Sequence, residues 1–201
     1  DDRTNWDQTF VLNANAPNIQ YTGTYRVYRN ATGPGGTWSA ISPDLTDGVV
    51  FSPRFHTIST VNVSDINDDL IYAGTTDGNV WVTQDLGANW ADITAGLPNR
   101  YVTCVKPSPV NTGTAFVSHS GYKYKEYIPH IHKTTDYGAT WKDISNNIPQ
   151  QGVNDLLIDP NDDNIIYAAT DAGVYGTFDG GGDWYRIGGS MRMIPVYDLE
   201  F

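Results

Sequence analysis

Apolar and polar residues alternate along much of the chain, in short runs that end at Gly, Pro, Asn or Asp. A period of two places successive side chains on opposite faces of a strand, and the turn-forming residues leave no run long enough for a helix. The runs occupy residues 6–12, 19–24, 57–63, 70–75, 102–105, 114–119, 153–158 and 165–170. The pattern predicts an all-β fold built from short antiparallel strands.

One motif, T-x-D-x-G-x-x-W, recurs downstream of these paired runs. It occupies residues 83–90, 134–141 and 177–184, and a degenerate copy at 28–38 keeps the glycines and Trp38 but lacks the Asp. A short polar segment with the pattern of an outer strand follows each Trp. The repeating unit is therefore four short antiparallel strands, with the motif in the turn between the third and the fourth. We expect the degenerate copy to bend differently.

Four-stranded units repeated every 40 to 50 residues or so are typical of a β-propeller, in which each blade buries its faces against its neighbours. We expect one partial β-propeller over residues 1–201, with blades at 1–43, 55–98, 100–149 and 152–190. Residues 194–201 repeat the phase of residues 153–158 and are expected to begin a fifth blade. The rest of the propeller is expected from the same or another chain.

These repeats resemble the Asp-box, or bacterial neuraminidase, repeat of sialidases, xyloglucan-active glycoside hydrolases, sortilin-type receptors and a photosystem assembly factor. The resemblance covers nearly the whole chain and implies a propeller from a large secreted bacterial protein. It also implies that the motif turns lie on the side away from the ligand. Sialidase chemistry is not implied, because none of the seven Arg residues lies in the Arg-Ile-Pro setting of that family. A shared fold does not by itself imply catalysis.

The motif residues are expected to be structural. A carboxylate in a tight turn accepts backbone N–H bonds, the Gly adopts a positive φ, and the Trp locks the hairpin to the blade with a large apolar face. A carboxylate held in this way is a poor base at neutral pH. The residues concerned are Asp85, Gly87 and Trp90, then Asp136, Gly138 and Trp141, and finally Asp179, Gly181 and Trp184.

Two insertions interrupt the regular spacing of the repeat. Trp141 and Trp184 are 43 residues apart, whereas the two preceding Trp-to-Trp steps are 52 and 51 residues. The extra residues lie at 44–56, after the first blade, and at 120–130, inside the third. In a propeller, both kinds of connection emerge on the same face, and loops with aromatic and polar side chains suit a sugar or a peptide. The predicted ligand-binding residues are Arg54, Phe55, His56, Tyr122, Tyr124, Glu126, Tyr127 and His130. The alternative is that these loops pack their own aromatic residues against the blade rim.

Charge and cysteine content narrow the choice of partner. There are 12 Lys and Arg residues against 23 Asp and Glu residues, and the resulting net charge of −11 argues against nucleic acid and anionic membranes. Neutral or cationic ligands are favoured, and no membrane insertion is expected. Cys104 is the only cysteine, so it forms no internal disulfide. His130 and His132 share a strand face, but His119 is the only third ligand nearby, so no metal or other cofactor is expected.

Three functions fit these observations. The first is a non-catalytic extracellular module that recognises a glycan or a protein within a larger secreted or surface protein. The second is a fragment of a xyloglucanase-like glycoside hydrolase, which needs two facing carboxylates. Asp44, Asp47 and Glu126 are the insertion carboxylates that could contribute one. The third is a structural scaffold, which needs neither a binding surface nor a carboxylate pair.

Overall fold

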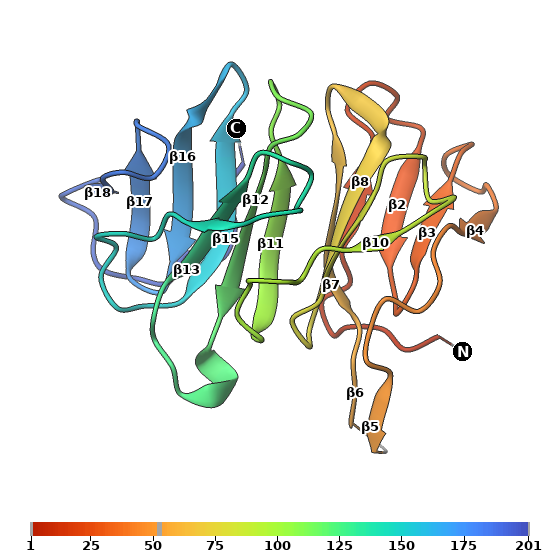
Figure 1. Ribbon diagram of the computed structural model, residues 1–201, viewed down its shortest axis with the longest axis horizontal. Helices are drawn as coiled ribbons and strands as arrows, with labels where there is room; N and C mark the ends of the chain where they lie inside the picture. The colour runs from red at the N-terminus through yellow and green to blue at the C-terminus, as the bar shows by residue number, and fades with distance from the viewer. Residues whose placement is uncertain (1, 52–53, 201) are drawn as a thin grey trace.

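The computed structural model describes residues 2–51 and 54–200, without the side chains of residues 50, 51, 54 and 55. The described chain forms four antiparallel four-stranded sheets that stand side by side, together with one two-stranded hairpin (Figure 1). Within each sheet the strands follow one another in sequence order. The predicted all-β fold of about four blades is therefore confirmed.

The strands of each sheet are as follows. Blade one contains β1 (Phe10–Leu12), β2 (Gln20–Gly23), β3 (Val27–Asn30) and β4 (Trp38–Ala40). Blade two contains β7 (Ile58–Ser64), β8 (Asn67–Thr75), β9 (Val80–Thr83) and β10 (Ala91–Asp92). Blade three contains β11 (Tyr101–Pro107), β12 (Ala115–Ser120), β13 (His130–Thr134) and β14 (Lys142–Asp143). Blade four contains β15 (Val153–Asp159), β16 (Asp162–Thr170), β17 (Gly173–Thr177) and β18 (Tyr185–Ile187).

The hydrophobic core lies between the sheets. One cluster joins blades one and two and includes Tyr21 and Ile58, and a second joins blades two and three around Tyr72. A third joins blades three and four and includes Phe116 and Leu156. Blades two and three therefore bury both faces of their inner strands, which explains why β8 is buried at every position from 70 to 75.

The Trp of each intact motif connects its blade to the preceding one. The indole N–H of Trp90 donates a 2.8 Å hydrogen bond to the backbone carbonyl of Ile41, at the end of blade one. A Cβ added to Gly87 would come within 2.4 Å of the same Ile41 carbonyl, so only Gly allows this approach. At the next two junctions the indoles of Trp141 and Trp184 donate to the carbonyls of Ile93 and Ile144, and a Cβ on Gly138 or Gly181 would meet the side chain of the same isoleucine. The motif is thus an inter-blade contact as well as a turn.

The carboxylate of each motif is held inside its own turn. Asp85 accepts a 2.8 Å bond from the backbone N–H of Asn89 and another from the hydroxyl of Thr83. The side chain of Asn89 is the main cause of the lowered pKa of Asp85. The pKa of Asp136 and of Asp179 is lowered in the same way, chiefly by Thr140 and Thr177 respectively. In the degenerate copy, Asn30 takes the place of the Thr and Asp, accepting from the N–H of Thr32 and donating to the carbonyl of Gly33.

Near both ends of the described chain, some residues with a strand-like pattern do not form a strand. The run at 6–12 becomes a strand only from Phe10, because the Asn5 side chain accepts the N–H of Trp6 in a bend. Residues 194–200 are assigned no strand, yet they lie beside blade four: Val196 donates its N–H to Thr170 at 2.9 Å. The Asn154 side chain in turn donates to the carbonyl of Val196. No helix among the described residues has the length and apolar character to span a bilayer.

Candidate functional site

The two insertions project from the same side of the sheets (Figure 1). The first forms the hairpin of β5 (Val49–Phe51) and β6 (Arg54–Phe55), and the second contains the 3₁₀ helix η1 (Tyr122–Tyr124). The side chains of Arg54 and Phe55 lie outside the described part of the chain. His56 is half-buried, and its carbonyl accepts a 3.3 Å bond from Arg3.

The blade-three loop is anchored by Glu126. Its carboxylate contacts Arg100 at 2.5 Å and His130 at 2.5 Å, and these two partners lower the pKa of Glu126, His130 foremost. The carbonyl of Gly121 accepts the N–H groups of both Tyr124 and Glu126, which closes the loop on itself. The guanidinium of Arg100 also lies 4.5 Å from the centre of the Tyr124 ring. Glu126 and His130 therefore help to hold the loop in shape.

A groove runs beside this loop, across the starts of the inner strands β7, β11 and β15. It consists of two hollows, with volumes of about 470 and 560 Å³, that share Tyr101 and Lys123. The first hollow is further lined by Thr4, Asn5, Trp6, Thr57 and Thr76. The second is further lined by Thr103, Ser120, Tyr122, Asn154, Asp171, Pro195 and Tyr197. We call these lining side chains the groove residues.

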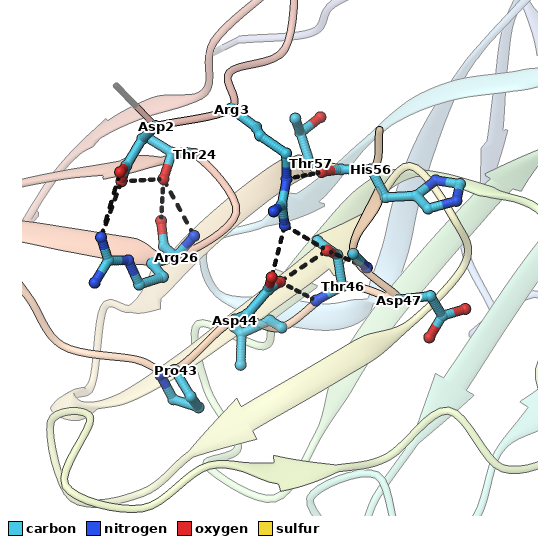
Figure 2. Close-up of polar contacts among 12 residues, drawn as sticks. Asp2, Arg3, Thr24, Arg26, Pro43, Asp44, Thr46, Asp47, His56 and Thr57 are labelled. Atoms are coloured by element: carbon cyan, nitrogen blue, oxygen red, sulfur yellow. Dashed lines mark hydrogen bonds and ion pairs between the residues drawn. The ribbon is translucent and has the colours of Figure 1, made fainter. Parts of the chain in front are cut away.

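The segment before β1 forms one wall of the groove and is fixed by polar contacts. Figure 2 shows the Arg3 side chain reaching Asp44 at 2.6 Å and Thr46 at 3.2 Å. Partial burial tends to raise the pKa of Asp44, but the bonds from Arg3 and Thr46 outweigh it and the pKa is lowered. The Asn5 amide donates a 3.0 Å bond to the hydroxyl of Tyr101, 96 residues away in blade three.

Asp2 extends this wall over blade one. Its carboxylate accepts a 2.5 Å bond from the hydroxyl of Tyr28. It also accepts a 3.1 Å bond from the hydroxyl of Thr24 and pairs with Arg26 (Figure 2). The Tyr28 bond is the main cause of the lowered pKa of Asp2. These contacts tie the start of the described chain to blade one.

The groove contains few charged groups. The ammonium of Lys123 lies 4.9 Å from the centre of the Tyr101 ring. Asp171 is the one carboxylate among the lining residues that the structure describes, and it accepts a 3.1 Å bond from Asn154. Asp44 and Glu126 are used in ion pairs, while Asp47 accepts a bond from Asn79. No second carboxylate therefore faces Asp171 across the described groove.

The structure separates the residues that the sequence grouped as a ligand site. Of the predicted set, Tyr122 is the one that lines the described groove. Tyr124 contacts Arg100, and Tyr127 is exposed outside the groove lining. The aromatic residues that sequence reasoning missed are Trp6, Tyr101 and Tyr197, which come from three segments of the chain far apart in sequence. Tyr101 could have been found from its position, because it is the first residue of an inner strand and the groove crosses the starts of these strands.

His119 is an unusual replacement within the repeat. It pairs with Val102 in the same register as Thr75 pairs with Ile58 and Thr170 with Val153. The hydroxyl of Thr170 donates to the Gly173 carbonyl and closes a tight turn.

In blade three, where that turn is expanded into the insertion, His119 is fully buried and neither ring nitrogen has a hydrogen-bond partner. Burial first, then His132 and His130, lower the pKa of His119 to about 3. Within residues 2–51 and 54–200, no three metal-ligating side chains are grouped closely enough to hold an ion.

Comparison with known proteins gives structural matches only. No protein-family model matches the sequence, and no curated protein matches it. An ancestral GH74 enzyme superposes on 94% of this chain with a TM-score of 0.72 and 19% identity. The GH74 xyloglucanase of Xanthomonas campestris covers 88% with a TM-score of 0.66 and 18% identity, and YCF48 of Cyanidioschyzon merolae covers 92% with 0.66 and 15%.

These matched proteins are β-propellers. This chain has a β-propeller fold. The propeller prediction made from the repeat is therefore confirmed. Matches at such low sequence identity establish a shared fold and no shared function. The chain spans 25% and 29% of the two enzymes and 61% of YCF48, so the present blades correspond to part of each of those chains.

Proposed function

We propose that this propeller segment is a non-catalytic recognition module that binds a glycan chain along the groove residues. The observation that carries the proposal is the row of aromatic side chains in the groove. Trp6 is completely exposed, and Tyr122 and Tyr197 are 71% and 73% exposed. Exposed aromatic rings in a hollow mark a binding surface, and their flat faces suit stacking against sugar rings.

The polar groove residues fit a ligand rich in hydroxyl groups. The amides of Asn5 and Asn154 and the hydroxyls of Thr57, Thr76 and Ser120 lie along the two hollows. Amides and hydroxyls both donate and accept hydrogen bonds, so they can pair with sugar hydroxyls in several orientations. A peptide could use the same groups, and a protein ligand is therefore the outcome that the binding experiment must separate from a glycan.

A glycoside hydrolase is the second candidate, favoured by the GH74 likeness and by Asp171 in the groove. Glycosidases use two carboxyl groups separated by about 5 to 9.5 Å. The described groove supplies one, so hydrolysis requires a second carboxylate from blades beyond this chain. The lack of a facing carboxylate within the described lining supports recognition over hydrolysis.

We further propose that other blades, from the same or another polypeptide, complete the ring and that the protein is extracellular. At the blade-one end, Trp38 is partly exposed, and a Cβ on Gly35 would meet nothing within 4 Å. These positions match Trp90 and Gly87, which contact a preceding blade. The threonine, aspartate, glycine and tryptophan of the three intact turns support their assignment as Asp-boxes. A structural scaffold would also need these edges but no groove.

The test is a calorimetric binding screen with neutral and acidic polysaccharides, with reducing-sugar release followed for every ligand. The variant is the double substitution Tyr122→Ala with Tyr197→Ala, and Tyr127→Ala is the matched control on the same loop. Binding without release that is lost in the double variant supports the proposal. Release of sugar overturns the non-catalytic role, binding that persists in the double variant overturns the groove assignment, and binding only of proteins overturns the glycan assignment.

A further inference from the structure

Lys123 occupies the centre of the groove. It is the charged residue shared by the two hollows, so a ligand that spans both passes its side chain. Three arginines beside this face are already neutralised, Arg3 by Asp44, Arg26 by Asp2 and Arg100 by Glu126. Within the described residues, no carboxylate lies within 4 Å of the Lys123 ammonium. Lys123 is therefore a positive charge available to a ligand.

The loop presents this ammonium in a defined position. Lys123 lies in η1, whose ends are held by the carbonyl of Gly121 and by the left-handed backbone of Lys125. The Tyr101 ring beneath the ammonium attracts it through the negative face of the ring while leaving its N–H donors free on the other side. Tyr101 itself is fixed by the bond from Asn5. The charge is thus prepositioned between stacking surfaces.

We propose that Lys123 forms an anion-binding subsite and that the glycan bound in the groove is an acidic polysaccharide carrying uronate carboxylates. This inference rests on the proposed glycan-binding function and names its ligand class. A uronate ring can stack on Tyr122 while its carboxylate pairs with Lys123. Asp171 also lines the second hollow, where its carboxylate can accept hydrogen bonds from sugar hydroxyls.

The overall charge of the protein makes such binding selective. A net charge of −11 opposes the approach of every polyanion, acidic polysaccharides included, so adsorption by charge alone is not expected and the contacts in the groove must outweigh this repulsion. Only a ligand that places its carboxylate at Lys123 and its rings on the aromatic residues recovers favourable contacts. Polyglutamate is therefore a suitable charge-matched probe without sugar rings.

The test measures the affinity of oligogalacturonides and of their fully methyl-esterified forms by calorimetry. The wild type should bind the free acid at least tenfold more tightly than the ester. Lys123→Gln should abolish this difference, because it removes the charge and keeps the stacking rings. Lys123→Arg should retain the preference, and Lys125→Gln, on the same loop outside the groove, should behave as the wild type.

The outcomes separate the two proposals. Equal or tighter binding of the ester overturns the anion-binding subsite while glycan binding stands. Binding of neutral xyloglucan oligosaccharides alone has the same meaning. A preference for the acid that survives Lys123→Gln also overturns the subsite. Binding of polyglutamate with no binding of any glycan overturns both proposals, as does the absence of binding to every probe.

Discussion

The indole N–H of Trp90 in blade two is hydrogen-bonded to the carbonyl of Ile41 in blade one at 2.8 Å. The same bond recurs at the next two blade junctions, so it is a regular device for joining neighbours. We expect Trp90→Phe, which removes the donor and keeps most of the apolar area, to cost about 1 kcal/mol of unfolding free energy. The urea midpoint measures this loss. Trp38→Phe is the control and should cost less, and equal losses would contradict the inter-blade role.

A second prediction concerns two glycines with nearly the same backbone angle. Gly138 has a φ of 89° and Gly96 a φ of 87°, so alanine is strained at both, by about 1 to 2 kcal/mol. A Cβ at Gly138 would also lie 2.5 Å from the Ile93 side chain, whereas nothing lies within 4 Å at Gly96. Gly138→Ala should therefore lower the thermal midpoint clearly more than Gly96→Ala. Matching losses would show that Ile93 moves aside at little cost.

The buried His119 predicts sensitivity to acid. Its folded-state pKa is lowered from 6.5 to about 3, so the unfolded chain binds more protons between these values. Stability is full above the ordinary pKa and falls as the pH falls toward 3, by about 2 kcal/mol at pH 5. The groups around it are His132, which adds to the effect through its own lowered pKa, and His130.

Unfolding midpoints in urea at pH 7.5 and pH 5 provide the measurement. His119→Thr restores the residue used by the other blades and should flatten the dependence, whatever its effect on stability at pH 7.5. His56→Gln is the control and should leave the slope unchanged. A slope that persists in His119→Thr would assign the acid sensitivity elsewhere.

The fourth prediction concerns the loop anchor. Glu126→Gln weakens the contacts to Arg100 and His130 that hold the loop closed. We expect trypsin to cut after Lys123 and Lys125 several-fold faster in this variant, with the rest of the chain resistant. Limited proteolysis followed by mass spectrometry gives the rates. Asp65→Asn, in an exposed turn of blade two, is the control, and an unchanged cleavage rate would show that other contacts hold the loop.

The repeat could be predicted from the sequence because its determinants are local. The spacing from Thr83 to Trp90 and the strand-like run of residues 70–75 each lie within a few residues. Contacts between blades could not be predicted in this way. The indole of Trp141 finds its acceptor 48 residues earlier, and no local pattern distinguishes that partner from the Trp's own blade.

The groove was harder still to predict. Asn5 and Tyr101 are 96 residues apart, and only the curvature of the assembled blades brings the segment before β1 to the start of β11. Sequence reasoning concentrated on insertions because they interrupt the spacing. In the structure, the polar groups of Glu126 and His130 contact each other and hold the inserted loop in shape. Ordinary repeat positions line most of the groove.

The Trp-to-Ile contacts link each blade only to its immediate neighbours, so stability is distributed as in a one-dimensional array. Blades two and three each have two partners within this chain, whereas blades one and four have one. When this four-blade segment is studied by itself, opening should propagate inward from blades one and four, with amide hydrogens of β2 and β16 exchanging before those of β8 and β12. The groove spans blades two to four. A ligand bound in it should therefore protect blade four from opening and add its binding free energy to the stability of that blade.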